Sequence, residues 1–173
     1  MADESAPVAL ARRSLEHYLG GRGYLTAPAG LPAELRGRAG VFVSLKKRGE
    51  LRGCIGTFTP TQPDIAAEII HNAVSAGTND PRFEPVTAAE LASFDISVDV
   101  LSSPERVDSL EDLDVKKYGV IVRRGVRSGL LLPDLEGVDT VEEQVGIAMR
   151  KAGIVPEEEI DLYRFTVTRY GKE

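Results

Sequence analysis

The sequence predicts an α+β fold built on a largely antiparallel sheet flanked by helices. Stretches with apolar residues at three- and four-residue spacing, typical of helices, are mixed with short β-rich stretches in an irregular order. Two β-rich stretches contain their own turn residues and are interpreted as hairpins. A parallel α/β fold would need repeating strand–helix units, and the sequence shows no internal repeat. The 173 residues fit one compact domain, and 42% of them are apolar, enough for a core without disulfides.

Three stretches have the residue spacing of helices. The first covers about residues 6–19 and ends at a pair of glycines. The second starts at Asp64, whose side chain can cap a helix, and we expect Gly77 to end it. The third opens with a capping box at Thr140 and closes at Gly153.

The remaining patterned stretches predict strands. Residues 41–56 and residues 120–132 are each expected to form a hairpin around a turn rich in Arg and Gly. A capping box at 87–90 predicts a short helical turn. After it, apolar and polar residues alternate over 94–100, which predicts a strand with one buried face and one face in water. A similar alternation over 163–168 predicts a last strand.

Composition and charge argue against several classes of function. There are 21 Lys and Arg against 27 Asp and Glu, with 6% aromatic residues, so a dedicated nucleic-acid binder is not expected. A single cysteine rules out an internal disulfide, and two histidines do not complete a Cys/His metal set. We expect no metal and no cofactor, although carboxylates for an oxygen-ligand site are plentiful. The acidic N-terminus and the lack of a long apolar run predict an unexported, cytoplasmic protein with no membrane segment.

The most unusual segment is LRGCIG, residues 51–56, in the second arm of the first predicted hairpin. Gly53 and Gly56 weaken a strand because they have no side chain to pack. Glycines at such positions predict either a β-bulge or a close approach by a ligand or another part of the backbone. Cys54, which lies between them, is the only cysteine of the chain. A segment that departs in this way from the residue preferences of a strand can mark a functional site.

The same segment has a second feature, the spacing of its cysteine and arginine. If the segment is extended, Arg52 and Cys54 lie on one face, about 6–7 Å apart, while Ile55 lies on the other. A nearby arginine would stabilise the Cys54 thiolate, most strongly in a semi-buried cleft with a low effective dielectric constant. Two interpretations stay open. Cys54 is either a reactive or ligand-contacting thiol, or a small packed residue, since free cysteine is among the most buried residue types.

Three further features each have a functional and a structural interpretation. The cations of residues 46–48, together with Arg52, could dock a phosphate or carboxylate, or could form a solvated turn that protects the hairpin edge. In the stretch with two prolines after the second helix, Asp80 and Arg82 could belong to a site, or could pair and cap the turn. His71 could serve as a base if it faces the cysteine, although a lone helical histidine is more often exposed or satisfied.

Four segments carry a resemblance to a known family. They are LRGCIG at 51–56, NDPRFEPV at 79–86, GLLLP at 129–133 and KAGI at 151–154. The chain resembles the AMMECR-one domain family, also called protein A of the AmmeMemoRadiSam system, over about residues 15–170. LRGCIG is the hallmark of that family. The resemblance therefore implies that residues 1–173 hold a single AMMECR-one domain.

The resemblance implies an α+β fold with a larger domain and a small subdomain, in which LRGCIG lies near a cleft. It implies no particular catalytic activity. Members of the family look functionally associated with a Memo-like protein of the extradiol-dioxygenase fold and with a radical S-adenosylmethionine enzyme. Some relatives are fused to the Memo-like domain. This sequence shows no such fusion, so we expect any such partner to be a separate chain.

Two hypotheses about function follow, from different classes. In the first, the chain is a binding component that receives an unknown small molecule or the two partner proteins through a cleft at LRGCIG. The ligand-binding candidates are Gly53, Ile55, Gly56, Asp80 and Arg82. The lack of a second strong acid–base partner for the cysteine favours this hypothesis.

In the second hypothesis, the chain is a cysteine-dependent enzyme. The catalytic candidates are Cys54 as nucleophile or redox thiol, Arg52 as stabiliser of the thiolate, and His71 as a weak candidate for the base. Asp80 and Arg82 would position a substrate. Regulation of a nucleic acid would depend only on the basic cluster around Arg52 and ranks last.

Overall fold

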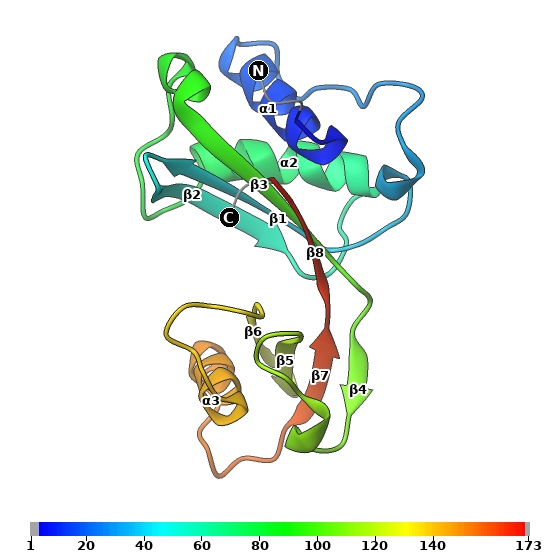
Figure 1. Cartoon of the computed structure of the whole chain (residues 1–173), viewed down its shortest axis with the longest axis vertical. Coiled ribbons are helices and arrows are strands. Elements are labelled where there is room, and N and C mark those ends of the chain that lie inside the picture. The colour runs from blue at the N-terminus through cyan, green and yellow to red at the C-terminus, as the bar shows by residue number, and fades with distance from the viewer. Residues whose placement is uncertain (1–3, 172–173) are drawn as a thin grey trace. The chain divides into compact units, whose positions relative to one another are not determined.

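The computed structural model describes residues 4–171 and confirms the α+β class (Figure 1). The helices are α1 (Ala6–Leu19), α2 (Ile65–Thr78) and α3 (Val141–Ala152), with short 3₁₀ helices η1 (Ala33–Leu35), η2 (Ala88–Ser93) and η3 (Leu110–Asp112). The strands are β1 (Val41–Lys47), β2 (Glu50–Thr57), β3 (Phe94–Leu101), β4 (Glu105–Val107), β5 (Gly119–Arg124), β6 (Arg127–Leu131), β7 (Asp161–Phe165) and β8 (Val167–Gly171). Within the described range, no helix combines the length and the apolar character needed to cross a bilayer.

The chain divides into two compact units, and each has its own four-stranded sheet. The first unit runs as far as Val100 and resumes at Thr168, and the second covers Leu101–Val167. The strand order is β2-β1-β3-β8 in the first sheet and β4-β7-β5-β6 in the second. Both predicted hairpins are antiparallel, one in each unit. The predicted antiparallel strands thus form two separate sheets, one in the larger first unit and one in the smaller second unit.

The two units repeat one order of elements. In the first, the hairpin of β1 and β2 is followed by α2 and then by β3, which pairs with β1. In the second, the hairpin of β5 and β6 is followed by α3 and then by β7, which pairs with β5. The two ββαβ segments share this order but few of their residues, which is why the sequence shows no repeat.

The first unit packs α2 against its sheet. Alternate residues of β1, namely Val41, Val43 and Leu45, are fully buried in the core that includes residues of both α1 and α2. At the tip of the hairpin, Arg48 and Gly49 have φ angles of 54° and 81°. Two successive positive φ angles are what a two-residue type I′ turn requires. The turn residues of the sequence therefore predicted this hairpin correctly.

The second unit packs α3 on β5 and β6. The Thr140 hydroxyl accepts a hydrogen bond from the N–H of Glu143, and Gly153 ends the helix with a φ of 71°, both as predicted. A Cβ on Gly129 of β6 would overlap the carbonyl oxygen of Ala148. Glycine at this position therefore lets the backbone of α3 lie directly against the sheet.

The prediction that Gly77 ends the second helix is wrong. The helix continues through Thr78, and its C-cap residue is Asn79. A Cβ on Gly77 would lie 2.7 Å from Cδ1 of Leu15 in α1, and 3.0 Å from Cγ2 of Val86. The glycine is therefore explained by close packing of α1 on α2, which local sequence signals do not report.

Two predictions about strands are wrong in part. Asp99 of β3 is 3% exposed instead of facing water, because Arg169 of β8 donates hydrogen bonds of 2.7 and 2.8 Å to its carboxylate. The last predicted strand is broken at Thr166, whose N–H and C=O both bond to Ser102. As a result, β7 and β8 belong to different sheets. The short strand β4 was not predicted.

Candidate functional site

The LRGCIG segment lies on β2, at an edge of the first sheet. Leu45 of β1 pairs with Gly53, but the next residue, Lys46, pairs with Leu51. Arg52 is therefore an extra residue without a partner on β1, which is the β-bulge that the glycines suggested. Because the extra residue breaks the alternation of side chains, the prediction that Arg52 and Cys54 share one face of the strand is wrong.

The two glycines of the segment are explained by packing within the chain. A Cβ on Gly53 would overlap the carbonyl oxygen of Ala76, so α2 lies directly against this strand. A Cβ on Gly56 would overlap the ring of Phe42, its partner on β1. Ile55 packs against the core of the first unit. The ligand contacts expected at these positions stay predictions.

Cys54 is half-buried and lies directly opposite Ser44 of β1. Ser44 alternates with the core residues Val43 and Leu45, so the Ser44 and Cys54 side chains lie on the other face of the sheet, away from α2. The Ser44 hydroxyl donates a hydrogen bond of 3.2 Å to the Cys54 sulfur. Ser44 is thus a neighbour of the thiol that the sequence did not single out.

The backbone of Cys54 is bound by the loop of residues 79–86, here called the edge loop. The N–H of Cys54 donates to Oδ2 of Asp80 at 3.0 Å, and its carbonyl oxygen accepts from Nη2 of Arg82 at 3.4 Å. An edge strand presents unpaired N–H and C=O groups, which attract other strands. The edge loop pairs these groups with side chains and so protects this part of β2.

Asp80 and Arg82 form a bidentate ion pair. Arg82 donates from Nε to Oδ1 at 3.1 Å and from Nη2 to Oδ2 at 2.8 Å. The Asp80 side chain is 2% exposed, whereas that of Arg82 is 57% exposed. The hydrogen bond from Arg82 holds the pKa of Asp80 far below its usual value, with help from the Cys54 N–H. Asp80 is therefore a buried, fully charged anchor for an arginine that faces solvent.

The cation that the structure brings to Cys54 is therefore Arg82. Its pKa is raised, first by the hydrogen bond to Asp80 and further by the charge of the same carboxylate. Asp80, Arg82 and Cys54, three of the predicted site residues, thus come together at the edge of the first sheet.

Arg52 is engaged elsewhere. Its guanidinium donates to both carboxylate oxygens of Glu90 at 3.3 Å, and to the carbonyl oxygen of Glu84 at 2.7 Å. Lys47 binds the same Glu90 carboxylate at 3.1 Å. The pKa of Glu90 is lowered to about 2, first by the N–H of Thr87 and then by these two cations. Arg52 therefore holds η2 and the edge loop against the hairpin, and among the described residues its guanidinium makes no hydrogen bond to the Cys54 sulfur.

His71 is also separated from Cys54. It lies on the half-buried stripe of α2, whereas Asn72, which donates to the carbonyl oxygen of Val41, marks the side of α2 that faces the sheet. The His71 ring stacks on Tyr24, with 4.4 Å between the ring centroids and 21° between the planes. In the described part of the chain, no hydrogen bond or ion pair joins His71 to Cys54.

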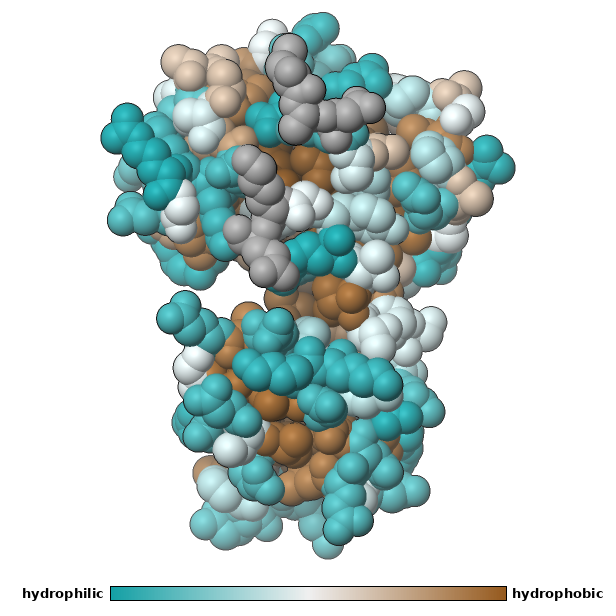
Figure 2. All heavy atoms as spheres, viewed as in Figure 1, coloured by the Kyte–Doolittle hydropathy of each residue, from teal (hydrophilic) through white to brown (hydrophobic). Residues whose placement is uncertain are grey.

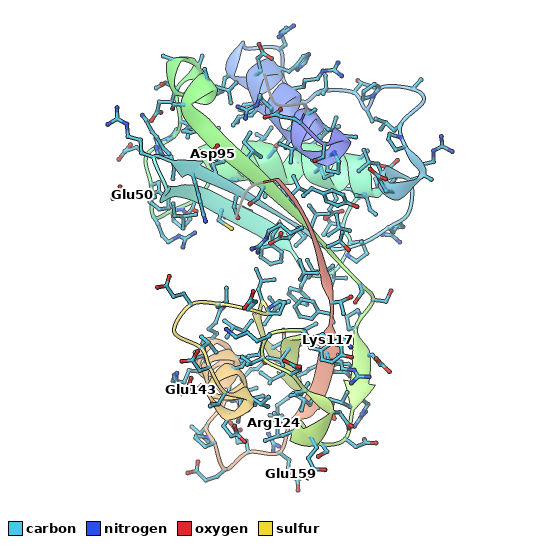
Figure 3. All side chains as sticks on the ribbon, viewed as in Figure 1. Glu50, Asp95, Lys117, Arg124, Glu143 and Glu159 are labelled. Carbon is cyan, nitrogen blue, oxygen red and sulfur yellow. The ribbon has the colours of Figure 1, made fainter. Side chains whose placement is uncertain are left out.

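The basic cluster of residues 46–48 and Arg52 is balanced by carboxylates. Glu90 binds two of its four cations. Glu50 and Asp95, labelled in Figure 3, lie opposite Lys47 and Lys46 at the same end of the sheet. The arrangement favours the protected hairpin end over a site for a large anion. Across residues 4–171, no group of three or more His, Cys, Asp and Glu side chains could hold a metal ion.

Comparison with known proteins decides the family. A family model described as AMMECR1 matches residues 8–170, nearly the whole chain. The chain belongs to the AMMECR1 family. The expected family is thereby confirmed.

Relatives of this AMMECR1 chain come from bacteria and archaea. A protein from Thermotoga maritima is 52% identical over 174 residues, covering 98% of this chain and 99% of that protein. Protein CA_C1420 from Clostridium acetobutylicum is 54% identical over 165 residues, which are 94% of this chain but 35% of that protein. The crystal structure of uncharacterized protein PH0010 from Pyrococcus horikoshii matches with a TM-score of 0.87 and 34% identity, over 96% of this chain and 90% of that one.

The geometry of the LRGCIG segment changes the prediction for thiol reactivity. We expect Arg82→Ala to slow alkylation of Cys54 at pH 7 by about two- to threefold, because it removes the cation that binds the Cys54 carbonyl oxygen, in a partly screened setting. Arg52→Ala is expected to leave the rate unchanged, since Arg52 binds Glu90. Rates are measured by mass spectrometry in the folded proteins. A larger effect of Arg52→Ala than of Arg82→Ala would contradict the assignment.

Proposed function

We propose that this AMMECR1 chain is a binding component that acts in the cytoplasm with a Memo-like protein and a radical S-adenosylmethionine enzyme. The observation that carries the proposal is that both expected helpers of Cys54 are engaged elsewhere. Arg52 binds Glu90, and His71 stacks on Tyr24. Neither of the two side chains expected to activate the thiol is available to it, and Arg82, the cation at Cys54, is itself bound to Asp80 and to the Cys54 carbonyl oxygen.

The binding group of this proposal is the Arg82 guanidinium. Asp80 fixes it with two hydrogen bonds, while more than half of the side chain stays open to solvent. An arginine held in place before binding loses little entropy when it meets a carboxylate or phosphate. We therefore expect an anionic group, on a small molecule or on a partner protein, to bind beside Cys54 at the edge loop.

The length of one relative supports a role beside other domains. The Clostridium acetobutylicum protein continues well beyond the region that matches this chain. A family domain that occurs both alone and within a longer chain is typical of a module that works next to another folded part.

Affinity purification of the tagged chain from native lysate, followed by mass spectrometry, tests the proposal. We expect a Memo-like chain and a radical S-adenosylmethionine enzyme to be recovered with the parent, and at least about fivefold less of each with Arg82→Ala, a loss of roughly 1 kcal/mol. The matched control is Arg106→Ala, because Arg106 is 63% exposed and pairs with Asp161 in the second unit. Failure to recover either partner, or equal recovery with Arg82→Ala, would refute the proposal.

A cysteine-dependent enzyme is the second candidate. Two observations favour it, namely the Ser44 hydroxyl that donates to the Cys54 sulfur and the Arg82 guanidinium that binds the Cys54 carbonyl oxygen. A covalent adduct on Cys54 in protein isolated from cells would support this candidate. Cys54→Ser separates the two functions, since a binding component keeps its partners with serine at this position and an adduct-forming enzyme loses its adduct.

A further inference from the structure

Gly146 lies in the interior of α3 without a reason inside the chain. Glycine destabilises a helix relative to alanine, so a helical glycine needs a packing explanation. At Gly129 there is one, because a Cβ there would overlap the backbone of Ala148. A Cβ on Gly146 would meet only Nη1 of Arg150 at 3.7 Å, an ordinary contact. Alanine would therefore fit, and the glycine points to an approach from outside the chain.

Gly146 lines an apolar groove beside α3. The groove has a volume of about 450 Å³ and is lined by Leu110, Glu142, Val145, Gly146, Met149, Arg150, Ile154 and Pro156. Leu110 is 40% exposed, unusual for a large apolar side chain. Figure 2 shows hydrophobic residues gathered on this face of the second unit, with hydrophilic residues around them.

The groove follows from the small number of helices in the second unit. Four strands make a sheet about 19 Å wide, whereas one helix with its side chains is about 10 Å across. The single long helix α3 packs on β5 and β6. Leu110 of the short η3 lines the groove together with residues of α3.

The charges at the rim of the groove are arranged symmetrically about the glycine. Glu142 and Arg150 lie four residues before and four residues after Gly146, and both are exposed. They are about 12 Å apart along the helix axis, too far to pair with each other. In the described part of the chain, neither side chain makes an ion pair.

We propose that a second copy of this chain binds in the groove, with the two α3 helices antiparallel and crossing at Gly146. A two-fold axis at Gly146 places Glu142 of each copy opposite Arg150 of the other, so the interface carries two identical ion pairs. The glycines allow the two backbones to approach closely at the crossing point. Leu110 and Met149 supply the apolar contact. The proposal concerns α3 alone and is independent of the role of Cys54.

Variants in which the charge at position 142 or at position 150 is reversed test the proposal. Association is measured by analytical ultracentrifugation of the full chain from about 1 to 500 µM, the range in which weak dimers are detected. We expect Glu142→Arg alone and Arg150→Glu alone each to weaken self-association at least about tenfold, because like charges then face each other twice. An equimolar mixture of the two variants is expected to associate as the parent does, because each heterodimer restores both pairs of opposite charge.

Two further variants keep the result interpretable. Glu136→Arg makes the same charge change at an exposed position outside the groove, and is expected to leave association unchanged. Gly146→Leu is expected to abolish association while the circular dichroism spectrum stays that of the parent, since a Cβ at position 146 would meet only Nη1 of the flexible Arg150 side chain, at 3.7 Å. A parent that stays monomeric throughout, or a mixture of charge variants that does not associate, would overturn the proposal.

Discussion

Gly53→Ala is expected to destabilise the first unit by at least about 3 kcal/mol, at the upper end of the effect of overpacking. The added methyl group would overlap the carbonyl oxygen of Ala76, a backbone atom that can move only if all of α2 moves away from β2. Ala73 and Ala76 of α2 are fully or almost fully buried, so such a movement also opens the core. Urea unfolding followed by circular dichroism measures the loss.

Two further variants serve as a parallel case and as a control for Gly53→Ala. Gly129→Ala creates the same overlap in the second unit, with the carbonyl oxygen of Ala148, and is expected to destabilise that unit instead. Gly37→Ala is the control, because its nearest neighbour would be Cδ1 of Ile65 at 4.0 Å. A Gly53→Ala protein that is as stable as Gly37→Ala would show that α2 does not require glycine at position 53, and would favour the close approach of a ligand instead.

Asp80→Ala is expected to reduce the free energy of unfolding by about 3 kcal/mol, because two backbone N–H groups and the Arg82 guanidinium lose a charged acceptor. Asp80→Asn keeps the shape but removes the charge, and is expected to cost about half as much. The control is Asp161→Asn, whose side chain is 47% exposed and pairs with Arg106 on the surface. That change is expected to stay within about 0.5 kcal/mol of the parent.

The pH dependence of stability provides an independent check on Asp80. Its pKa is lower in the folded protein than in the unfolded chain, so the unfolded state binds the proton more tightly. The stabilisation is therefore fully present above the unfolded pKa of about 3.9, and is lost as the pH falls below that value. We expect Asp80→Asn to flatten the decline of stability between about pH 5 and pH 3. An unchanged decline would contradict the role of Asp80 as the charged anchor.

Local signals in the sequence were sufficient for much of the fold. The turn at Arg48 and Gly49, the cap at Asp64 and the capping box at Thr87 are all present as predicted. Each is a contact between residues at most a few positions apart. Gly77 was misinterpreted because its reason is Leu15, far away in the sequence. Distant contacts of this kind also decide how strands are divided between the two sheets.

The contacts of the candidate site also depend on a feature that local sequence signals did not locate, the bulge at a single residue. Counting back from the two-residue turn, a regular hairpin would put Ser44 opposite Gly53. The bulge at Arg52 shifts the register, so Ser44 lies opposite Cys54 instead. Since side chains alternate, this single residue also sends Arg52 toward Glu90, while Arg82 is the cation that binds the backbone of Cys54. The sequence identified Cys54, Asp80 and Arg82, but their contacts depend on the bulge.

The position of β8 has a consequence for synthesis on the ribosome. Its strand lies beside β3 in the first sheet, although the whole second unit separates the two in the chain. The ordinary order, in which the N-terminal part of a protein matures first, is therefore reversed here. Residues 101–167 form a continuous unit that can complete its core as soon as it emerges, whereas the earlier residues must wait for the last strand. Until Arg169 has been synthesised, the carboxylate of Asp99 lacks these two hydrogen bonds, so we expect the first sheet to be completed only after the second unit has been made.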